Sequence, residues 1–253
     1  MEFLALAVAF REIEASSRRA RVEARLAALF RDAPDDATIL PYLLQGQLGP
    51  PYAAPDLGLD ERRIALAIAG AANVPIEEIW RRYDQLGDLG LVAEGLLTPS
   101  TGTPLTVRAV YDQLGRIATT VGVGSVVVKV RLLEDLFRRT GGPAARYLAR
   151  ICQGRLRLGV GDATVLDALS IAVSGGLGAR PPIARAYGWC ADLGVVAGRL
   201  LNGGLAALDE IRPTPGRPVL PALAERLPST EEVIRRLGRV IVEPKYDGLR
   251  LQA

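Results

Sequence analysis

The stretch "YDQLGDLGLVAEGL" (residues 83–96) returns further along the chain as "YGWCADLGVVAGRL" (187–200). The tyrosine, the Asp-Leu-Gly block, the Val-Ala pair and the final leucine coincide without a gap, at an offset of 104 residues. Upstream, "LFRDAPDDATILPYLLQGQL" (29–48) resembles "LFRRTGGPAARYLARICQGRL" (136–156) in the same order. We favour an internal duplication with copies near 22–96 and 129–200. The alternative is coincidence between helices rich in alanine and leucine.

Both copies carry the periodicity of amphipathic helices. Apolar residues recur at i, i+3 and i+4 in "VEARLAALF" (22–30), "IALAIAGAANV" (64–74) and "TVLDALSIAV" (164–173), with glycine and proline between the segments. The pattern predicts a mainly α fold, with a helical body over 1–208. Four prolines at 213, 215, 218 and 221 then mark a linker over 209–222. "STEEVIRRL" (229–237) predicts a short helix, and "RVIVEP" (239–244) and "LRLQ" (249–252) predict strands.

The composition excludes several kinds of catalytic and metal-binding site. The chain has no histidine, which removes Ser-His-Asp triads, Cys-His dyads and the usual zinc sites. Cys152 and Cys190 are too few and too far apart for a metal cluster, so we expect a buried, reduced pair. No apolar run reaches the roughly 18 residues of a membrane span, and the first residues, "MEFLALAVAFREIE", lack the positive charge of a secretion signal. We therefore expect a cytoplasmic protein without a membrane partner.

The two copies differ in charge. Residues 22–96 hold six arginines against twelve acidic residues, whereas 129–200 hold one lysine and ten arginines against five. A basic half of this kind is suited to a phosphate backbone. The simpler interpretation is that solvated helix faces happen to be basic.

One turn in the basic copy combines two arginines, two glycines and the start of a helix: "QGRLRLGVGDATVLDAL" (153–169). Arginines can bind phosphate oxygens with two donors each, glycines let the backbone approach a ligand, and a helix N-terminus, here capped by Asp162, presents free N–H groups. The corresponding turn of the first copy, "QGQLGPPYAAPDLGLDE" (45–61), has no arginine. A plain glycine-rich turn with two surface arginines is the alternative. The residues that we assign to phosphate-backbone binding are Arg155, Arg157, Gly159, Gly161 and Thr164.

Lysine is scarce in this chain, which uses arginine for nearly all of its positive charge. The two lysines are Lys129 and Lys245, and neither follows glycine, so a P-loop is excluded. Lys245 stands in "EPKYDGLR" (243–250), between the two expected strands. Lysine can act as a nucleophile where arginine cannot, provided that its pKa is lowered or a metal neutralises the phosphate that it attacks. An exposed lysine in a hairpin is the alternative.

These segments resemble the ATP-dependent DNA ligases. "EPKYDGLR" is similar to their adenylation motif, K-x-D-G-x-R, and "GDLGLVAE" (87–94), the stretch 136–170 and "GRPVLPALAERL" (216–227) are similar to their N-terminal region, in the same order. The resemblance implies that 1–208 is a DNA-binding domain that encircles nicked duplex. It implies that 223–253 begins an α+β nucleotidyltransferase domain. Lys245 would attack the α-phosphate of ATP to form lysyl-AMP, Glu243 would contact adenine, and Arg250 the ribose or a nearby phosphate.

The resemblance also sets limits. The family's carboxylates that hold Mg²⁺ would lie past Ala253, so we expect no metal ligand in this chain and an N-terminal fragment that is inactive alone. We expect a monomer whose partner is nicked double-stranded DNA, and the sequence does not choose among replication, repair and recombination. A non-enzymatic module that binds nicked DNA is the main alternative. An RNA ligase or capping enzyme, or NAD as the adenylate donor, fits the large helical region less well.

Overall fold

The computed structural model describes residues 1–98, 103–221, 226–244 and 248, and these residues are predominantly helical. β pairing in the described part is an isolated antiparallel bridge between Glu2 and Thr106. The prediction of a mainly α fold is therefore confirmed. The elements are α1 (Phe3–Glu14), α2 (Arg19–Asp32), η1 (Pro34–Asp36), α3 (Leu40–Leu44), α4 (Glu61–Ala72), α5 (Ile76–Leu86), α6 (Leu89–Leu96), α7 (Val107–Thr119), α8 (Ser125–Arg139), α9 (Pro143–Cys152), α10 (Asp162–Ser174), η2 (Leu177–Ala179), α11 (Arg180–Cys190), α12 (Leu193–Gly203), η3 (Leu205–Glu210) and α13 (Thr230–Leu237).

Five helices recur in the same order in the two sequence copies. Helices α2 to α6 belong to the first copy, and α8 to α12 repeat them in the second. The breaks between α5 and α6 and between α11 and α12 have the same design. Gly87 and Ala191 both adopt the left-handed conformation, with φ of 66° and 48°. Asp88 and Asp192 then accept backbone N–H groups of the following helix, as N-cap residues do.

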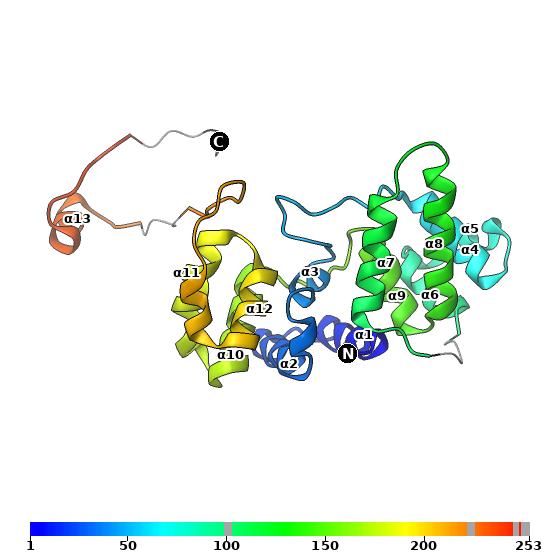
Figure 1. Ribbon diagram of the computed structural model, residues 1–253, viewed down its shortest axis with the longest axis horizontal. Helices are drawn as coiled ribbons and strands as arrows, with labels where there is room; N and C mark the ends of the chain where they lie inside the picture. Colours follow the sequence, from blue (N-terminus) through cyan, green and yellow to red (C-terminus); the bar gives the residue numbers. More distant parts are fainter. Residues whose placement is uncertain (99–102, 222–225, 245–247, 249–253) are drawn as a thin grey trace.

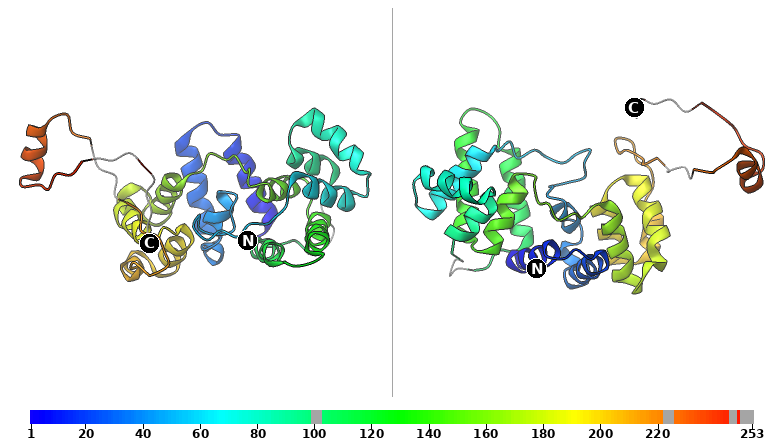
Figure 2. Two further views of the ribbon diagram at one scale, coloured as in Figure 1. Left: turned by 90° about the horizontal axis from the view of Figure 1, so that it is seen from above. Right: turned by 180° about the vertical axis from the view of Figure 1, so that it is seen from behind.

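The two copies exchange helices rather than folding side by side. Helix α2 packs on α10 and α3 on α12, whereas α8 packs on α4 and α9 on α6. Lobe A therefore consists of α2, α3 and α10–α12, and lobe B of α4–α9. Figures 1 and 2 show α10–α12 at one end of the helical body, α4–α9 at the other, and α1–α3 between them. The difference in charge between the two copies is therefore not a difference between two halves of the molecule, because each lobe mixes helices of both copies.

The glycine of the repeated Asp-Leu-Gly block has a packing role. A Cβ atom at Gly194 of α12 would lie 2.3 Å from the carbonyl oxygen of Thr38, beside α3. A Cβ atom at Gly90 of α6 would lie 2.7 Å from the carbonyl oxygen of Arg146 in α9. Real side chains do not approach backbone oxygens so closely, so both exchanged contacts require glycine.

The cap aspartates also bind the exchanged helices. Asp192 accepts a hydrogen bond from the hydroxyl of Tyr42 in α3 at 2.5 Å. Asp88 accepts the Nε and Nη2 donors of Arg150 in α9 at 2.9 and 2.6 Å. Burial alone would raise the pKa of Asp88, but the hydrogen bonds and the charge of Arg150, together with the backbone N–H groups of Gly90 and Leu91, lower it. The buried Arg150 also binds Glu14 of α1 at 2.9 Å, so α1, α6 and α9 share one ionic cluster.

The segment after η3 leaves the helical body. Leu220 N–H donates to the carbonyl of Gly188 at 2.8 Å, which holds residues 219–221 along α11. Helix α13 begins at its predicted place with Ser229 as N-cap, buries none of its residues and lies apart from the other helices (Figure 1). Residues 239–244 form no strand, contrary to expectation, because a strand needs a neighbouring strand and none of the described residues supplies one. The expected strand at 249–252 lies outside the described residues.

Candidate nucleic-acid interface

The turn between α9 and α10 alternates buried and exposed residues. Leu156 and Val160 are buried, with 3% and 9% of their surface exposed. Arg155, Arg157 and Gly159 between and beside them are exposed. The apolar side chains thus anchor the backbone of the segment that joins the two lobes, while the side chains of both arginines reach solvent.

Arg157 occupies a backbone conformation that favours glycine. Its φ is 55°, close to the 67° of Gly159 two residues later. For a residue other than glycine, a left-handed conformation costs on the order of 1–3 kcal/mol. An arginine at such a position points to a functional use of its side chain, because glycine would fit the local backbone without strain.

The N-terminus of α10 has no side-chain cap. Gly161 is the N-cap residue, so Asp162 is the first helical residue and not the cap that the sequence predicted. Its carboxylate is held from two sides, by Gln45 Nε2 at 2.8 Å and by the Tyr187 hydroxyl at 2.5 Å. Thr164 lies half-buried in the first turn. The first N–H groups of α10 therefore have no side-chain acceptor from the N-cap and can bind an anion.

Two hollows meet at Arg157. An open cleft of about 370 Å³ is lined by Arg157, Gly159 and Gly161 together with glutamines of the first copy, Gln45 and Gln47. A small polar cavity of about 20 Å³ is lined by Arg155 and Arg157 with Asp88, Arg150 and Gln153. The structure thus brings four of the five predicted backbone-binding residues together. Thr164 lines neither hollow.

Glu61, which the sequence did not single out, forms an ion pair with Arg155. Arg155 Nη1 lies 2.7 Å from Glu61 Oε1, and Gln153 Nε2 lies 3.3 Å from the same oxygen. The side chains of Arg155 and Glu61 are 55% and 39% exposed. An exposed pair contributes about 0.2–1 kcal/mol, so a phosphate can displace Glu61 from Arg155.

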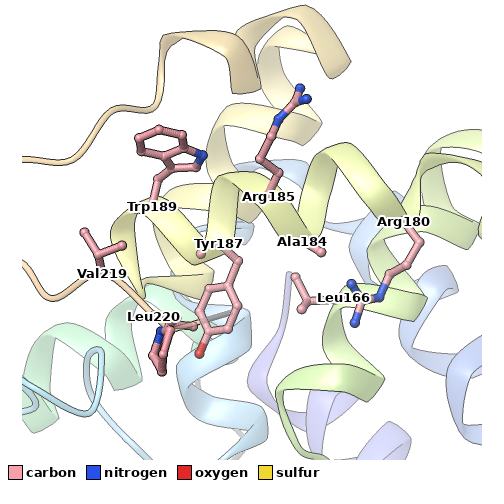
Figure 3. Close-up of a pocket in the computed structure, with 10 residues that line it drawn as sticks. Leu166, Arg180, Ala184, Arg185, Tyr187, Trp189, Val219 and Leu220 are labelled. Atoms are coloured by element: carbon pink, nitrogen blue, oxygen red, sulfur yellow. The ribbon is translucent and has the colours of Figure 1, made fainter. Parts of the chain in front are cut away.

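A third hollow, on α11, has a different character. It measures about 500 Å³ and is bordered by residues 219–221, with Trp189 and Val219 on one side and Leu166 on the other (Figure 3). Its two arginines are already paired, Arg180 with Asp167 at 2.7 Å and Arg185 with Asp209 at 3.4 Å. The groove is therefore mainly apolar and offers no unpaired cation to a phosphate.

Of the three residues predicted for nucleotide chemistry, Glu243 alone lies within the part of the chain that the structure describes. Glu243 is exposed in the unpaired stretch after α13, and Lys245 and Arg250 lie outside the described residues. Within the described ranges, no group of three or more acidic, histidine or cysteine side chains is arranged to hold a metal ion. Cys152 and Cys190 are buried and free, as predicted. No described helix is both long and apolar enough to cross a membrane.

Comparison with known proteins adds independent findings. A family model described as "DNA ligase N terminus" matches residues 2–170. A DNA ligase of Acidianus ambivalens is 40% identical over 270 aligned residues, which cover all of this chain and 45% of that relative. DNA ligases of Aeropyrum pernix and Saccharolobus solfataricus are 42% and 39% identical, and the chain covers 45% and 44% of them. The chain thus spans less than half the length of these curated relatives.

Proposed function

The chain belongs to the DNA ligase family, and we propose that it takes part in sealing nicks in duplex DNA, with ATP as the adenylate donor. Its helical body holds the duplex, and the turn at 153–161 contacts the sugar–phosphate backbone. The observation that carries this assignment is Arg157, an exposed arginine kept at a strained φ of 55° in the turn that leads into an uncapped helix.

The chemistry of the turn suits a backbone contact. Arg155 and Arg157 each present a planar fork of N–H donors that matches two phosphate oxygens. The free N–H groups of α10 add a positive helix end on the same side of the turn. Neither feature reads base edges, so binding through this turn is independent of sequence. A nick-sealing enzyme has the same requirement, because nicks occur in any sequence.

The adenylation step is proposed from the motif around Lys245. Lys245 is the nucleophile toward the α-phosphate of ATP, Glu243 contacts the adenine, and Arg250 contacts the ribose or a phosphate. The described residues do not form a nucleotide pocket around Glu243, and they supply no cluster of Mg²⁺ ligands. We therefore assign no step of nucleotide or metal chemistry to the helical body, which acts as the grip on DNA.

The DNA grip is tested by salt-dependent binding to a labelled nicked duplex. We expect the logarithm of the binding constant to fall linearly with the logarithm of salt concentration, with a slope of about −0.9 for each phosphate contact. Replacing Arg155 and Arg157 together by alanine is expected to weaken binding and to make this slope shallower by up to about 1.8. Arg25→Ala, which breaks an ion pair with Glu12, is the matched control. An unchanged slope in the folded double variant would contradict the assigned contact.

The adenylation proposal has a separate test in the full-length protein encoded by the gene. Incubation with ATP labelled at the α-phosphate is expected to transfer label to the protein, and Lys245→Arg is expected to abolish the transfer, because arginine does not give up its proton. Label retained on another residue would refute the assignment of Lys245. Salt-sensitive DNA binding without any label transfer would favour a non-enzymatic module that binds nicked DNA.

A further inference from the structure

Lys129 is a buried charge that the proposed function has not used. It is 8% exposed, and its Nζ donates a hydrogen bond to the carbonyl oxygen of Leu57 at 2.7 Å. A Cβ atom at Gly58 would lie 3.0 Å from Nζ, so the ammonium packs directly against the backbone of this glycine. Among the described residues, Lys129 forms no ion pair with a carboxylate. Burying an ammonium without a counter-charge is costly, so its retention calls for a physical reason.

The backbone that Lys129 supports is the counterpart of the Arg157 turn. Gly58 and Gly159, separated by an offset of 101 residues, have φ of 63° and 67°. Each is followed three residues later by the first residue of a helix, Glu61 of α4 and Asp162 of α10. The internal duplication thus gives each lobe a glycine turn that leads into a helix N-terminus, and Lys129 places its charge directly behind the turn of lobe B.

An open cleft of about 600 Å³ lies beside this second turn, between α4 and α8. Its acidic residues are already paired, Asp60 with Arg63 at 3.3 Å and Glu134 with Arg138 of α8. Two other arginines of the cleft, Arg62 and Arg131, are exposed and have no ion pair within the described residues. The cleft therefore carries an excess of positive charge.

The same cleft also exposes apolar side chains. Val126 and Val127 of α8 are 42% and 56% exposed, and Leu66 of α4 is 42% exposed. The tip of the α7–α8 hairpin adds Val121 and Val123, which are almost fully exposed. A ligand that covers this surface must combine negative charge with apolar faces. The backbone of duplex DNA has both, since phosphates alternate with deoxyribose rings and apolar side chains commonly contact the minor groove.

We propose that the α4–α8 cleft is a second contact for the backbone of duplex DNA. Arg62 and Arg131 bind phosphates, and Lys129 is a positioning residue that holds the Gly58 turn. Helix α4 links the two contacts, because Glu61 at its start pairs with Arg155 and the next residue, Arg62, lines the cleft. This inference rests on the proposed function, since it assigns a second surface to the same DNA.

Charge removal in the cleft is the first test. Arg62→Ala combined with Arg131→Ala is expected to weaken binding to the nicked duplex and to reduce the salt slope by up to about 1.8, since each phosphate contact contributes about 0.9. Arg81→Ala on α5, an exposed arginine paired with Glu78, is the matched control. A slope unchanged by the cleft substitutions but reduced in the Arg155 and Arg157 variant would overturn this inference and leave the proposed function standing. Wild-type protein with no salt-sensitive DNA binding would overturn both.

The role of Lys129 needs a measurement that a purely structural role would not change. Lys129→Met keeps the length of the side chain and removes a buried charge that is costly to desolvate, but it also leaves the Leu57 carbonyl without this donor. Because these two effects on stability oppose each other, we expect weaker DNA binding with little change in melting temperature. In a double-mutant cycle, Lys129→Met should remove little further affinity once Arg62 is already alanine. Full DNA affinity in the folded Lys129→Met protein, or fully additive losses, would overturn the positioning role.

A second variant covers the case in which Lys129→Met does not fold. Gly58→Ala leaves the ammonium in place but strains the turn, because alanine disfavours φ of 63° and its Cβ would meet Nζ. The same loss of affinity for nicked duplex is expected. Gly175→Ala at the end of α10, also at a positive φ but with no atom within 4 Å of its Cβ, is the control for backbone strain alone. Equal DNA affinity in both glycine variants would count against the role of the Gly58 turn.

Discussion

Replacing Glu61 with glutamine is expected to tighten DNA binding and to destabilise the fold. Glu61 pairs with Arg155 at 2.7 Å, and a phosphate that binds Arg155 must displace this carboxylate. Glutamine keeps an oxygen that can accept the hydrogen bond from Gln153 and removes the competing charge. The same carboxylate lies in the first turn of α4, where a negative charge interacts favourably with the helix dipole. Affinity and stability should therefore move in opposite directions.

The size of the effect follows from the exposure of the pair. With side chains 55% and 39% exposed, the ion pair contributes about 0.2–1 kcal/mol, which corresponds to a gain of about 1.4- to 5-fold in affinity for the nicked duplex. Loss of the favourable dipole interaction is expected to cost about 0.3–1 kcal/mol of unfolding free energy. Both changes should shrink at high salt, because the groups are exposed.

The assay is fluorescence anisotropy of a labelled nicked duplex at several salt concentrations, together with urea denaturation. Glu77→Gln, which removes an exposed charge from the first turn of α5, controls for the change in net charge. The gain from Glu61→Gln should vanish when Arg155 is alanine. A gain of equal size in that background, or in Glu77→Gln, would show that Glu61 acts through net charge and not by occupying Arg155.

Three further results are expected. Gly194→Ala should cost about 1–3 kcal/mol in urea denaturation, because its Cβ would clash with backbone of the exchanged segment, whereas Gly115→Ala, with nothing within 4 Å, should not destabilise the protein. Arg157→Gly should lower DNA affinity and salt slope with no loss of thermal stability, since glycine adopts this φ freely. Burial would raise the pKa of Asp88, but hydrogen bonds from Arg150 lower it. The ionised carboxylate of Asp88 therefore contributes its full stabilisation above about pH 4, and this contribution is lost as the pH falls through the lowered pKa. Urea denaturation at a series of acidic pH values should show this loss of stability. The loss should be smaller in Arg150→Met.

Local patterns predicted most of the helices, and the helices in the two similar segments follow each other in the same order. Amphipathic periodicity and the Asp-Leu-Gly block depend on residues close together in sequence, and Gly90 and Gly194 are fixed by the same close approach in both copies. The exchange of helices was not predictable in this way. A repeat shows that two segments are alike, but it does not say whether α2 packs within its own copy or on α10.

The candidate site was predicted in part for the same reason. Glycines at 159 and 161 signalled a tight turn before a helix, and the structure places them there. Glu61 and Lys129 were missed because their partners lie 94 and 72 residues away along the chain. A signal for Glu61 was available, since aligning "LGLDER" (57–62) with "LGVGDA" (158–163) places it opposite Asp162. The strand expected at 239–244 is not formed, because β propensity measures how well a side chain fits a pleated sheet, and a sheet needs a neighbouring strand.

Charge is distributed differently around the two glycine turns. In lobe A, Arg157 precedes the glycine and α10 continues with Ala163 and Thr164. In lobe B, the position equivalent to Arg157 is Asp56, whose carboxylate accepts the N–H of Gly58 at 2.9 Å. The positive charge lies instead after the turn, in Arg62 and Arg63, and behind it, in Lys129. The two turns therefore share a backbone shape but carry their cations on different sides of it. This is the outcome expected if both turns meet a phosphate backbone from different directions.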